Sequence, residues 1–233
     1  DVIQTIDQLF VISDDGYHYL VAQHKGIEHK LEVRRLGTLK PEKKTKRSSD
    51  GIFRVVTCSY MVPVKRLNLL INAFNHCSSL IDWVHIGDGP LREELESLAS
   101  GLPENITWRF LGNKTNQEVI DYYVHHPVDL FINVSESEGI PVSIMEAFSC
   151  GIPAIATDVG GVSEIVSQQN GILVNQDITA VELAKTIEGY IKSSPAVKEK
   201  KSEKAFLTWS EKYNAEKNYA AFSERIKKLR IER

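Results

Sequence analysis

Two glutamates spaced eight positions apart, Glu138 and Glu146, lie in a segment suited to binding an anion that carries hydroxyl groups. We predict that this segment passes from a strand end into a helix, with Pro141 at the first helical position, where its missing N–H costs nothing. The first helical turn then presents three unpaired amides, those of Val142, Ser143 and Ile144. Such a helix start attracts anions, and a diphosphate is the commonest large one. The carboxylates suit hydroxyl groups, because one carboxylate can accept two hydrogen bonds from a diol.

The residues around this segment predict an α/β fold with a Rossmann-like, doubly wound parallel sheet. Val128–Val134 is short, β-branched and nearly all apolar, which indicates a buried parallel strand. Helical patterns separate most of the other predicted strands, which lie near residues 8–12, 31–36, 52–58, 81–86, 105–110, 153–157 and 171–174. The right-handed crossover rule places helices on both faces of the sheet and a ligand at the carboxyl ends of the strands.

Several sequence blocks occur in the order typical of one enzyme family. Besides the E-x7-E pair, these blocks are Val62–Phe74, Gly87–Leu91, Phe110–Gly112, Gly151-Ile152-Pro153 and Thr157–Gly161. Over residues 52–175 the combination resembles the retaining glycosyltransferases of family 4 (group 1), which have the GT-B fold. The resemblance implies the C-terminal, donor-binding half of such an enzyme. It would transfer a sugar, with retention, from a nucleotide diphosphate to an acceptor hydroxyl in cell-surface glycan or polysaccharide synthesis.

The resemblance also implies roles for individual residues. Glu138 and Lys65 would be the catalytic residues, with Glu138 on the donor sugar and Lys65 on the diphosphate. Glu146 would bind the ribose, and the loop at Gly112 would lie against the base. The implied substrate-binding residues are Ser59, Tyr60, Arg66, Leu111, Gly112, Gly139, Ile140, Val142, Ser143 and Glu146. We expect no metal and no other cofactor, because fixed dipoles and a lysine can stabilise the leaving diphosphate and no Asp-x-Asp pair is present.

Lys65 and its neighbours carry one argument for a phosphate and one departure from the family pattern. We expect Lys65 in the first turn of a helix, where a cation opposes the helix dipole and therefore calls for a bound anion. Many relatives have an arginine where this chain has Tyr60. Arg66 is the candidate to supply the second positive charge, but adjacent helix residues point about 100° apart. Whether Arg66 takes that role is left open by the sequence.

We divide the chain into three parts. Residues 1–50 are interpreted as the end of a preceding domain and a linker, 51–205 as the donor-binding domain and 206–233 as a C-terminal crossover helix. The chain begins with Asp1, and Val2–Gly37 resembles the closing strand and helix of the preceding domain, so we expect the sequence to be truncated. With the acceptor-binding domain missing, this chain is expected to bind donor without transferring sugar at an appreciable rate.

Composition and net charge indicate which kinds of binding partner and which cellular compartment to expect. A net charge of −3 argues against nucleic acid, and three cysteines without a disulfide pattern fit the cytoplasm. The lysine-rich segment Leu39–Asp50 reads as a solvated linker, with peripheral contact to anionic lipid at the inner face of a membrane as a further hypothesis. The acceptor would be a glycan or a lipid-linked glycan held by the missing domain.

Two other functions stay open at the level of the sequence. Another GT-B enzyme, such as a UDP-sugar 2-epimerase or a glycogen-synthase relative, would share the fold and the diphosphate site. A non-catalytic nucleotide-sugar binding module is the second alternative, and Tyr60 is its only support. A hydrolase is disfavoured because the chain has no G-x-S-x-G turn, and a dehydrogenase because no G-x-G-x-x-G follows the first strand.

Overall fold

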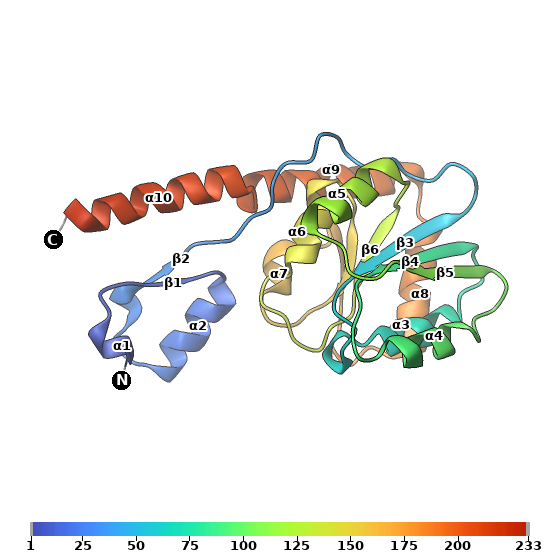
Figure 1. The fold of residues 1–233 in the computed structure, drawn as a ribbon, viewed down its shortest axis with the longest axis horizontal. Coiled ribbons are helices and arrows are strands. Elements are labelled where there is room, and N and C mark those ends of the chain that lie inside the picture. The colour runs from blue at the N-terminus through green and yellow to red at the C-terminus, as the bar shows by residue number, and fades with distance from the viewer. Residues whose placement is uncertain (1, 232–233) are drawn as a thin grey trace.

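The computed structural model describes residues 2–231 and has a parallel six-stranded sheet with helices on both faces (Figure 1). In spatial order the strands are β5 (Ile106–Phe110), β4 (Ile81–Ile86), β3 (Phe53–Cys58), β6 (Leu130–Asn133), β7 (Ala154–Thr157) and β8 (Gly171–Val174). The predicted doubly wound α/β fold is therefore confirmed.

Two hydrophobic cores cover the two faces of this sheet. Strand residues alternate between them, so that Phe131 faces one core while Leu130 and Ile132 face the other. The first core includes α5 (Asn116–His125), α6 (Val142–Ser149), α7 (Val162–Ile165) and α9 (Pro195–Lys212). The second includes α3 (Leu67–Phe74), α4 (Arg92–Ala99) and α8 (Ala180–Ile191). Because the strands are buried on both faces, they read as nearly continuous apolar runs.

The strand order reverses between β3 and β6. From β3 the chain moves outward to β4 and β5, then returns to place β6 on the other side of β3. At such a switch point the loops leave in opposite directions and open a crevice at the carboxyl ends of the strands. The loop after β3 and the loop after β6 contain most of the predicted site residues.

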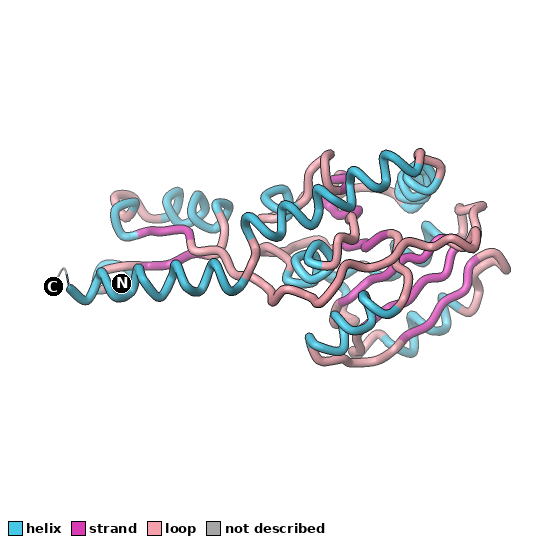
Figure 2. The backbone as a smooth tube through the Cα atoms, turned by 90° about the horizontal axis from the view of Figure 1, so that it is seen from above, coloured by secondary structure: helices cyan, strands magenta, loops and turns pink. Residues whose placement is uncertain are grey.

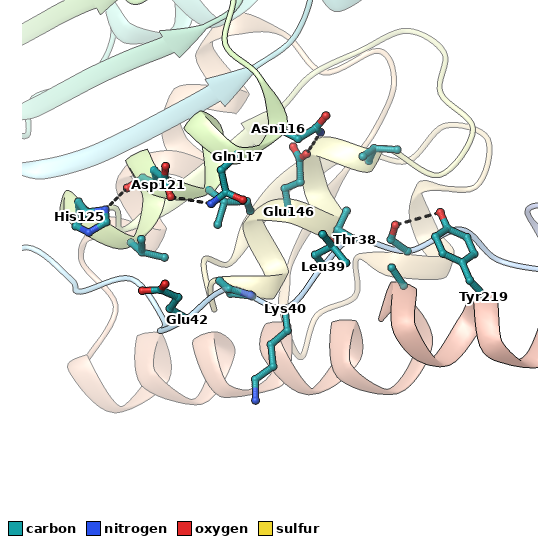
Figure 3. A pocket seen from close by; sticks show the side chains of 16 residues that line it. Thr38, Leu39, Lys40, Glu42, Asn116, Gln117, Asp121, His125, Glu146 and Tyr219 are labelled. Atoms are coloured by element: carbon teal, nitrogen blue, oxygen red, sulfur yellow. Dashed lines mark hydrogen bonds between the residues drawn. The ribbon is translucent and has the colours of Figure 1, made fainter.

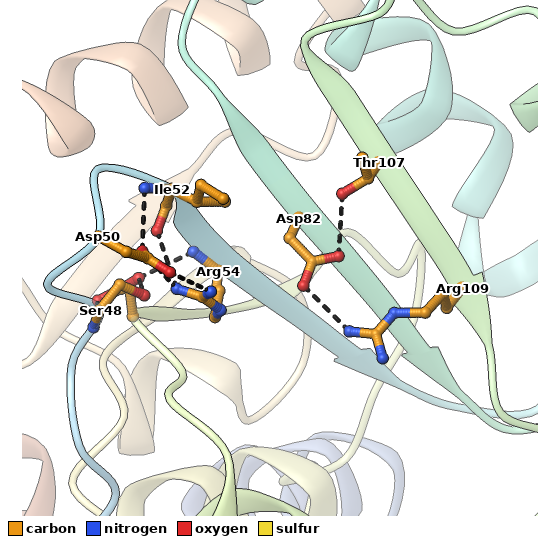
Figure 4. Close-up of polar contacts among 8 residues, drawn as sticks. Ser48, Asp50, Ile52, Arg54, Asp82, Thr107 and Arg109 are labelled. Carbon is orange, nitrogen blue, oxygen red and sulfur yellow. Dashed lines mark hydrogen bonds and ion pairs between the residues drawn. The ribbon is translucent and has the colours of Figure 1, made fainter.

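At the amino-terminal ends of the strands, polar side chains join neighbouring strands and the linker (Figure 4). Asp82 accepts hydrogen bonds from Thr107 Oγ1 at 3.1 Å and from Arg109 Nη2 at 3.0 Å. The buried carboxylate of Asp129 accepts from the amides of Ser48 and Arg54, at 3.0 and 2.8 Å, which fastens the linker to the first strand of the large sheet. Polar groups are thus paired at the amino-terminal ends of these strands, whereas most of the predicted site residues follow the carboxyl-terminal ends.

The N-terminal residues form a separate unit. It comprises α1 (Val2–Thr5), β1 (Leu9–Val11), α2 (Asp14–Gln23), a 3-10 turn (Glu28–Lys30) and β2 (Leu31–Val33), and its two strands pair only with each other. This unit contacts α10 (Ala215–Ile231), where Phe10 meets Phe222 edge-on at 5.0 Å between ring centroids. In Figures 1 and 2 it lies with α10 to one side of the large sheet.

The predicted single crossover helix is two helices. The predicted boundary at residue 206 falls inside α9. The helix is interrupted at Tyr213 and Asn214 before α10 begins. At this interruption Thr38, just before the linker, exchanges backbone hydrogen bonds with Tyr213 and Ala215, each at 3.0 Å. Asn214 then caps α10 by accepting from the amide of Lys217 at 3.2 Å. Within residues 2–231 no helix is both long enough and apolar enough to cross a membrane.

Glu188 on α8 joins this helix to the loop that follows α3. Its carboxylate accepts from the amides of Ser78 and Ser79, each at 2.8 Å, and from Lys192 Nζ at 2.8 Å. Burial by itself would raise the pKa of Glu188, but the bonds to Lys192 and to the two amides lower it to about 2.

We predict that Glu188→Gln lowers the free energy of unfolding at pH 7 by roughly 2–3 kcal/mol. A lowered folded-state pKa stabilises the fold above the unfolded value of 4.5, and this contribution is lost as the pH falls toward 2. The difference between the two proteins in urea unfolding should therefore shrink over that range. Glu224→Gln, in an exposed pair with Lys227, is the control and should change little. A difference that grows in acid would contradict the prediction.

Candidate functional site

The start of α6 presents two unpaired amides. Pro141 is the N-cap residue with ψ 120°, so the prediction that it occupies the first helical position is wrong by one residue. Its carbonyl accepts from the amide of Ile144 at 3.1 Å, which removes Ile144 from the three amides predicted to be unpaired. The amides of Val142 and Ser143 have no hydrogen-bond partner among residues 2–231. Two donors at the positive end of the helix thus stay available to an anion.

Lys65 and Glu138 form an ion pair across the switch point. Lys65 Nζ donates to Glu138 Oε1 at 2.6 Å, and Asn133 Nδ2 donates to the same oxygen at 3.2 Å. The side chains are 23% and 11% exposed, so the pair is largely shielded from water. The structure brings together the two residues that were predicted to be catalytic.

The expected helical position of Lys65 is wrong. Lys65 ends a 3-10 turn, Pro63–Lys65, and Arg66 in the left-handed conformation (φ 49°) separates that turn from α3. The argument from the dipole of the following helix therefore does not apply to Lys65. Its placement depends instead on Glu138, and the contact of their loops is reinforced by the amide of Glu136, which donates to the Val64 carbonyl at 2.8 Å.

Gly160 holds the Glu138 loop from the other side. A Cβ at Gly160 would lie 2.0 Å from the Glu138 carbonyl oxygen, and φ is +50°. Any side chain there would displace the loop. The Gly160-Gly161 pair that contributed to the sequence pattern is therefore explained by close backbone packing against the segment that carries Glu138.

Glu146 lies deeper than its partner glutamate. It is 4% exposed, and its Oε1 accepts from Asn116 Nδ2 at 2.5 Å. Burial raises the pKa of Glu146, and the Asn116 hydrogen bond opposes that shift. Sequence reasoning missed Asn116. The Thr115-x-x-Glu118 capping box marks the start of α5 and could have placed Asn116 at a helix end, but not beside Glu146.

A cavity of about 860 Å³ opens beside Glu146 (Figure 3). Its walls are the linker, the start of α5, the start of α6 and the beginning of α10, represented by Leu39, Asn116, Val142 and Tyr219. Figure 3 shows Glu146, joined to Asn116 by a hydrogen bond, between His125 on one side and Tyr219 on the other. The volume is that of a pocket for a medium-sized organic ligand.

Tyr60 and Arg66 are close to Lys65 in the sequence but have other surroundings than the Lys65–Glu138 ion pair. Tyr60 is 58% exposed on the loop after β3. Arg66 donates from Nε to the Val134 carbonyl at 2.6 Å and from Nη1 to the Gln176 carbonyl at 2.7 Å. It lines a different cavity of about 500 Å³. The guanidinium is thus engaged by backbone carbonyls, and its role as a second phosphate ligand stays a prediction.

The remaining predicted residues lie in the loops that follow β3, β5 and β6. Gly112 accepts from the Gly87 amide at 2.9 Å, Leu111 packs against the first core, and the Ser59 carbonyl meets His85 Nε2 at 3.1 Å. Ile140 is buried, and a Cβ at Gly139 would be 3.9 Å from Ile12 of the N-terminal unit.

The N-terminal unit is anchored close to the same crevice. The amides of Asp14 and Asp15, at the start of α2, both donate to the carboxylate of Glu164 at 3.0 Å. Arg35 adds an ion pair with Glu164 at 2.8 Å. A carboxylate at a helix start is stabilised by the amides and by the helix dipole. This contact fixes one wall beside the Glu138 loop.

Residues 52–193, more than half of the chain, match the model of the family described as glycosyl transferases group 1. The chain belongs to this family. It is 34% identical over 140 residues to the O-antigen biosynthesis glycosyltransferase WbnH of Escherichia coli, covering 59% of this chain and 38% of that protein. This glycosyltransferase domain thus spans about two fifths of the length of that relative.

Solved structures show the same GT-B fold. HepE of Anabaena, crystallised with UDP and glucose, superimposes with a TM-score of 0.79 at 20% identity, covering 97% of this chain and 65% of that one. Sucrose-phosphate synthase of Thermosynechococcus elongatus superimposes with a TM-score of 0.80 at 18% identity, covering 100% of this chain and 60% of that one.

We predict that Glu146→Gln stabilises the unliganded chain at pH 7.5. A raised folded-state pKa means that the fold loses stability as the pH rises from 4.5 toward the folded value, because burial disfavours the carboxylate. Glutamine removes that cost and keeps an oxygen for Asn116. The melting temperature should rise by a few degrees at pH 7.5 and change less near pH 4.5. Glu136→Gln, at an exposed position, is the control, and a lower melting temperature for Glu146→Gln at both pH values would contradict the prediction.

Proposed function

We propose that this glycosyltransferase domain is the donor-binding half of a retaining enzyme that moves a sugar from a nucleotide diphosphate to an acceptor hydroxyl. The proposal is carried by the shielded Lys65–Glu138 pair, together with the unpaired amides of Val142 and Ser143 at the helix start that follows the Glu138 loop. A lysine and two helix-start amides match a diphosphate, and a carboxylate matches sugar hydroxyls. The UDP-bound and UDP-glucose-bound structures of HepE support a nucleotide-sugar donor.

The charges of the site suit departure of a nucleoside diphosphate. As the glycosidic bond breaks, negative charge grows on the β-phosphate, and donors that are already oriented stabilise this charge most in the transition state. In the unliganded site Lys65 is neutralised by Glu138 at 2.6 Å. A bound diphosphate would share or take over that ammonium group, leaving Glu138 to accept hydrogen bonds from the sugar.

The Glu146 cavity is our proposed nucleoside pocket. The carboxylate lines a space of about 860 Å³ and is already oriented by Asn116. A ribose diol would supply the two donors that a buried, ionised Glu146 otherwise lacks. The Gly112 loop, which pairs with Gly87, is proposed to lie against the base.

The wider context is also a proposal. The matched share of WbnH, an O-antigen biosynthesis enzyme, supports a role in cell-surface glycan or polysaccharide synthesis. An acceptor glycan, free or lipid-linked, would enter from the side of the crevice opposite the donor, and no metal is required by this scheme. Contact with anionic lipid at the cytoplasmic face stays a prediction. Of the linker cations, Lys40, Lys43 and Lys46 lie exposed, while Arg47 pairs with Glu199.

We predict that Lys65→Ala weakens UDP or GDP binding by about ten- to a hundredfold, the worth of one charge-assisted hydrogen bond. The variant also leaves the Glu138 carboxylate unpaired beside the phosphates. Calorimetry with and without a chelator measures both effects, and binding should persist in the chelator. Lys227→Ala removes an exposed lysine that also pairs at 2.6 Å, and is the control. Unchanged affinity in Lys65→Ala, or loss of binding on chelation, would refute the proposed phosphate site.

The two glutamates should separate the parts of the ligand. Glu146→Gln should weaken UDP and UDP-sugar by the same factor, because the ribose is common to both. Glu138→Gln should preserve or strengthen UDP binding, since it releases Lys65, and should reduce only the additional affinity contributed by the sugar. Titration of both variants with each ligand measures the difference. Equal loss of UDP affinity in the two variants would show that these roles are wrongly assigned.

A further inference from the structure

His85 lies near the end of β4 with no exposed surface, and it has polar partners on both sides of its ring. Thr57 Oγ1 lies 2.8 Å from Nδ1, and the Ser59 carbonyl oxygen lies 3.1 Å from Nε2. Trp83 Nε1 lies 3.0 Å from the same Thr57 hydroxyl. The four residues therefore form one continuous chain of hydrogen bonds in the interior.

The direction of this chain is fixed by chemistry. A carbonyl oxygen can only accept, so His85 Nε2 carries a hydrogen and donates it to the Ser59 carbonyl. In the neutral imidazole Nδ1 is then an acceptor. The Thr57 hydroxyl therefore donates to Nδ1 while it accepts from the indole N–H of Trp83, which can only donate. Burial lowers the pKa of His85 to about 4, although the Ser59 bond acts in the opposite direction, so the ring stays neutral near pH 7.

This series of hydrogen bonds ends at Ser59, which lies outside the sheet on the loop that carries Lys65. Ser59 is the first residue after β3, and its amide donates to the Ile86 carbonyl at 3.0 Å. A Cβ at Gly87 would lie 1.9 Å from the Ser59 carbonyl oxygen, so the space that this carbonyl occupies exists only because residue 87 is glycine. Two residues later the Met61 amide donates to the Asp88 carbonyl at 2.8 Å. The start of the loop is thus held at three successive points.

We propose that His85 is a positioning residue of the donor site, which fixes the Ser59 carbonyl and thereby the loop from Ser59 to Lys65. This inference rests on the proposed function for its effect on binding. Its structural part is independent, because the hydrogen-bond chain orients the loop whether or not a ligand is present. An apolar residue in place of His85 leaves both the Thr57 hydroxyl and the Ser59 carbonyl without their buried partner, which frees the loop to move.

The first test is the state of the imidazole ring in the unmodified chain. Nitrogen-15 NMR should show the neutral Nε2–H form of His85 throughout pH 5.5 to 8. Hydrogen on Nδ1, or titration near pH 6.5, would overturn the proposal. This measurement involves no nucleotide, so its result does not depend on the proposed function.

The second test compares His85→Leu with Thr57→Val, which keeps the shape and the strand preference of the buried side chain. Both should accelerate hydrogen exchange at the Met61 and Lys65 amides, while exchange in α8 stays unchanged. Both should weaken UDP binding about three- to tenfold, and this loss should largely disappear in a Lys65→Ala background because the two changes act through the same loop. Glu188→Gln controls for a general loss of stability and should leave UDP affinity unchanged.

The outcomes distinguish a failure of the positioning role of His85 from a failure of the proposed function. Equal losses of affinity with and without Lys65, or unchanged exchange in the loop, would overturn the positioning role. If His85→Leu does not fold, Thr57→Val decides by the same two criteria. If the unmodified chain binds neither UDP nor GDP, the proposed function is wrong, whereas the exchange and NMR measurements still decide whether His85 orders the loop.

Discussion

The parallel pairing of β3 with β6 is the constraint on which the site depends. Val55 lies opposite Leu130 and Val56 opposite Phe131, so the two strands end at the same edge of the sheet. Lys65 follows one strand and Glu138 follows the other, and their contact joins positions 73 residues apart. Both flanking loops are packed backbone against backbone, which leaves little room for either charge to move. The register of two strands thus determines where the charges of the crevice lie.

Two buried carboxylates show how this domain treats structure and function differently. Glu188 is surrounded by amides and a lysine, and its pKa is lowered, so its charge stabilises the fold. Glu146 has a single amide donor in Asn116, and burial raises its pKa. Burial of a carboxylate with spare acceptor capacity beside a cavity opposes its ionisation and is a cost to the unliganded chain. Such costs are typical of sites kept for a ligand.

The cavity beside Glu146 is lined both by residues of the segment that matches the family and by residues outside that segment. Asn116, Val142 and Glu146 lie within the segment that matches the glycosyltransferase family, whereas Leu39 and Tyr219 come from the linker and α10 outside it. The diphosphate end of the proposed site therefore belongs to the shared fold. The far wall depends on the linker and on α10, which meet at the bridge between Thr38 and Asn214.

Local sequence predicted the strands, most helices and the anion-attracting start of α6, whereas the resemblance to family motifs assigned roles to Glu138, Glu146 and Lys65. Apolar periodicity and the placement of proline and glycine act between neighbours along the chain, so they can be read without coordinates. The local reading failed by one residue at Pro141 and by one element at Lys65, where a turn and a helix share the same pattern. Only the tertiary structure decided that Asn116 meets Glu146 and that His85 meets Ser59. These contacts join separate elements, and their distances are set by packing between layers rather than by any neighbour in sequence.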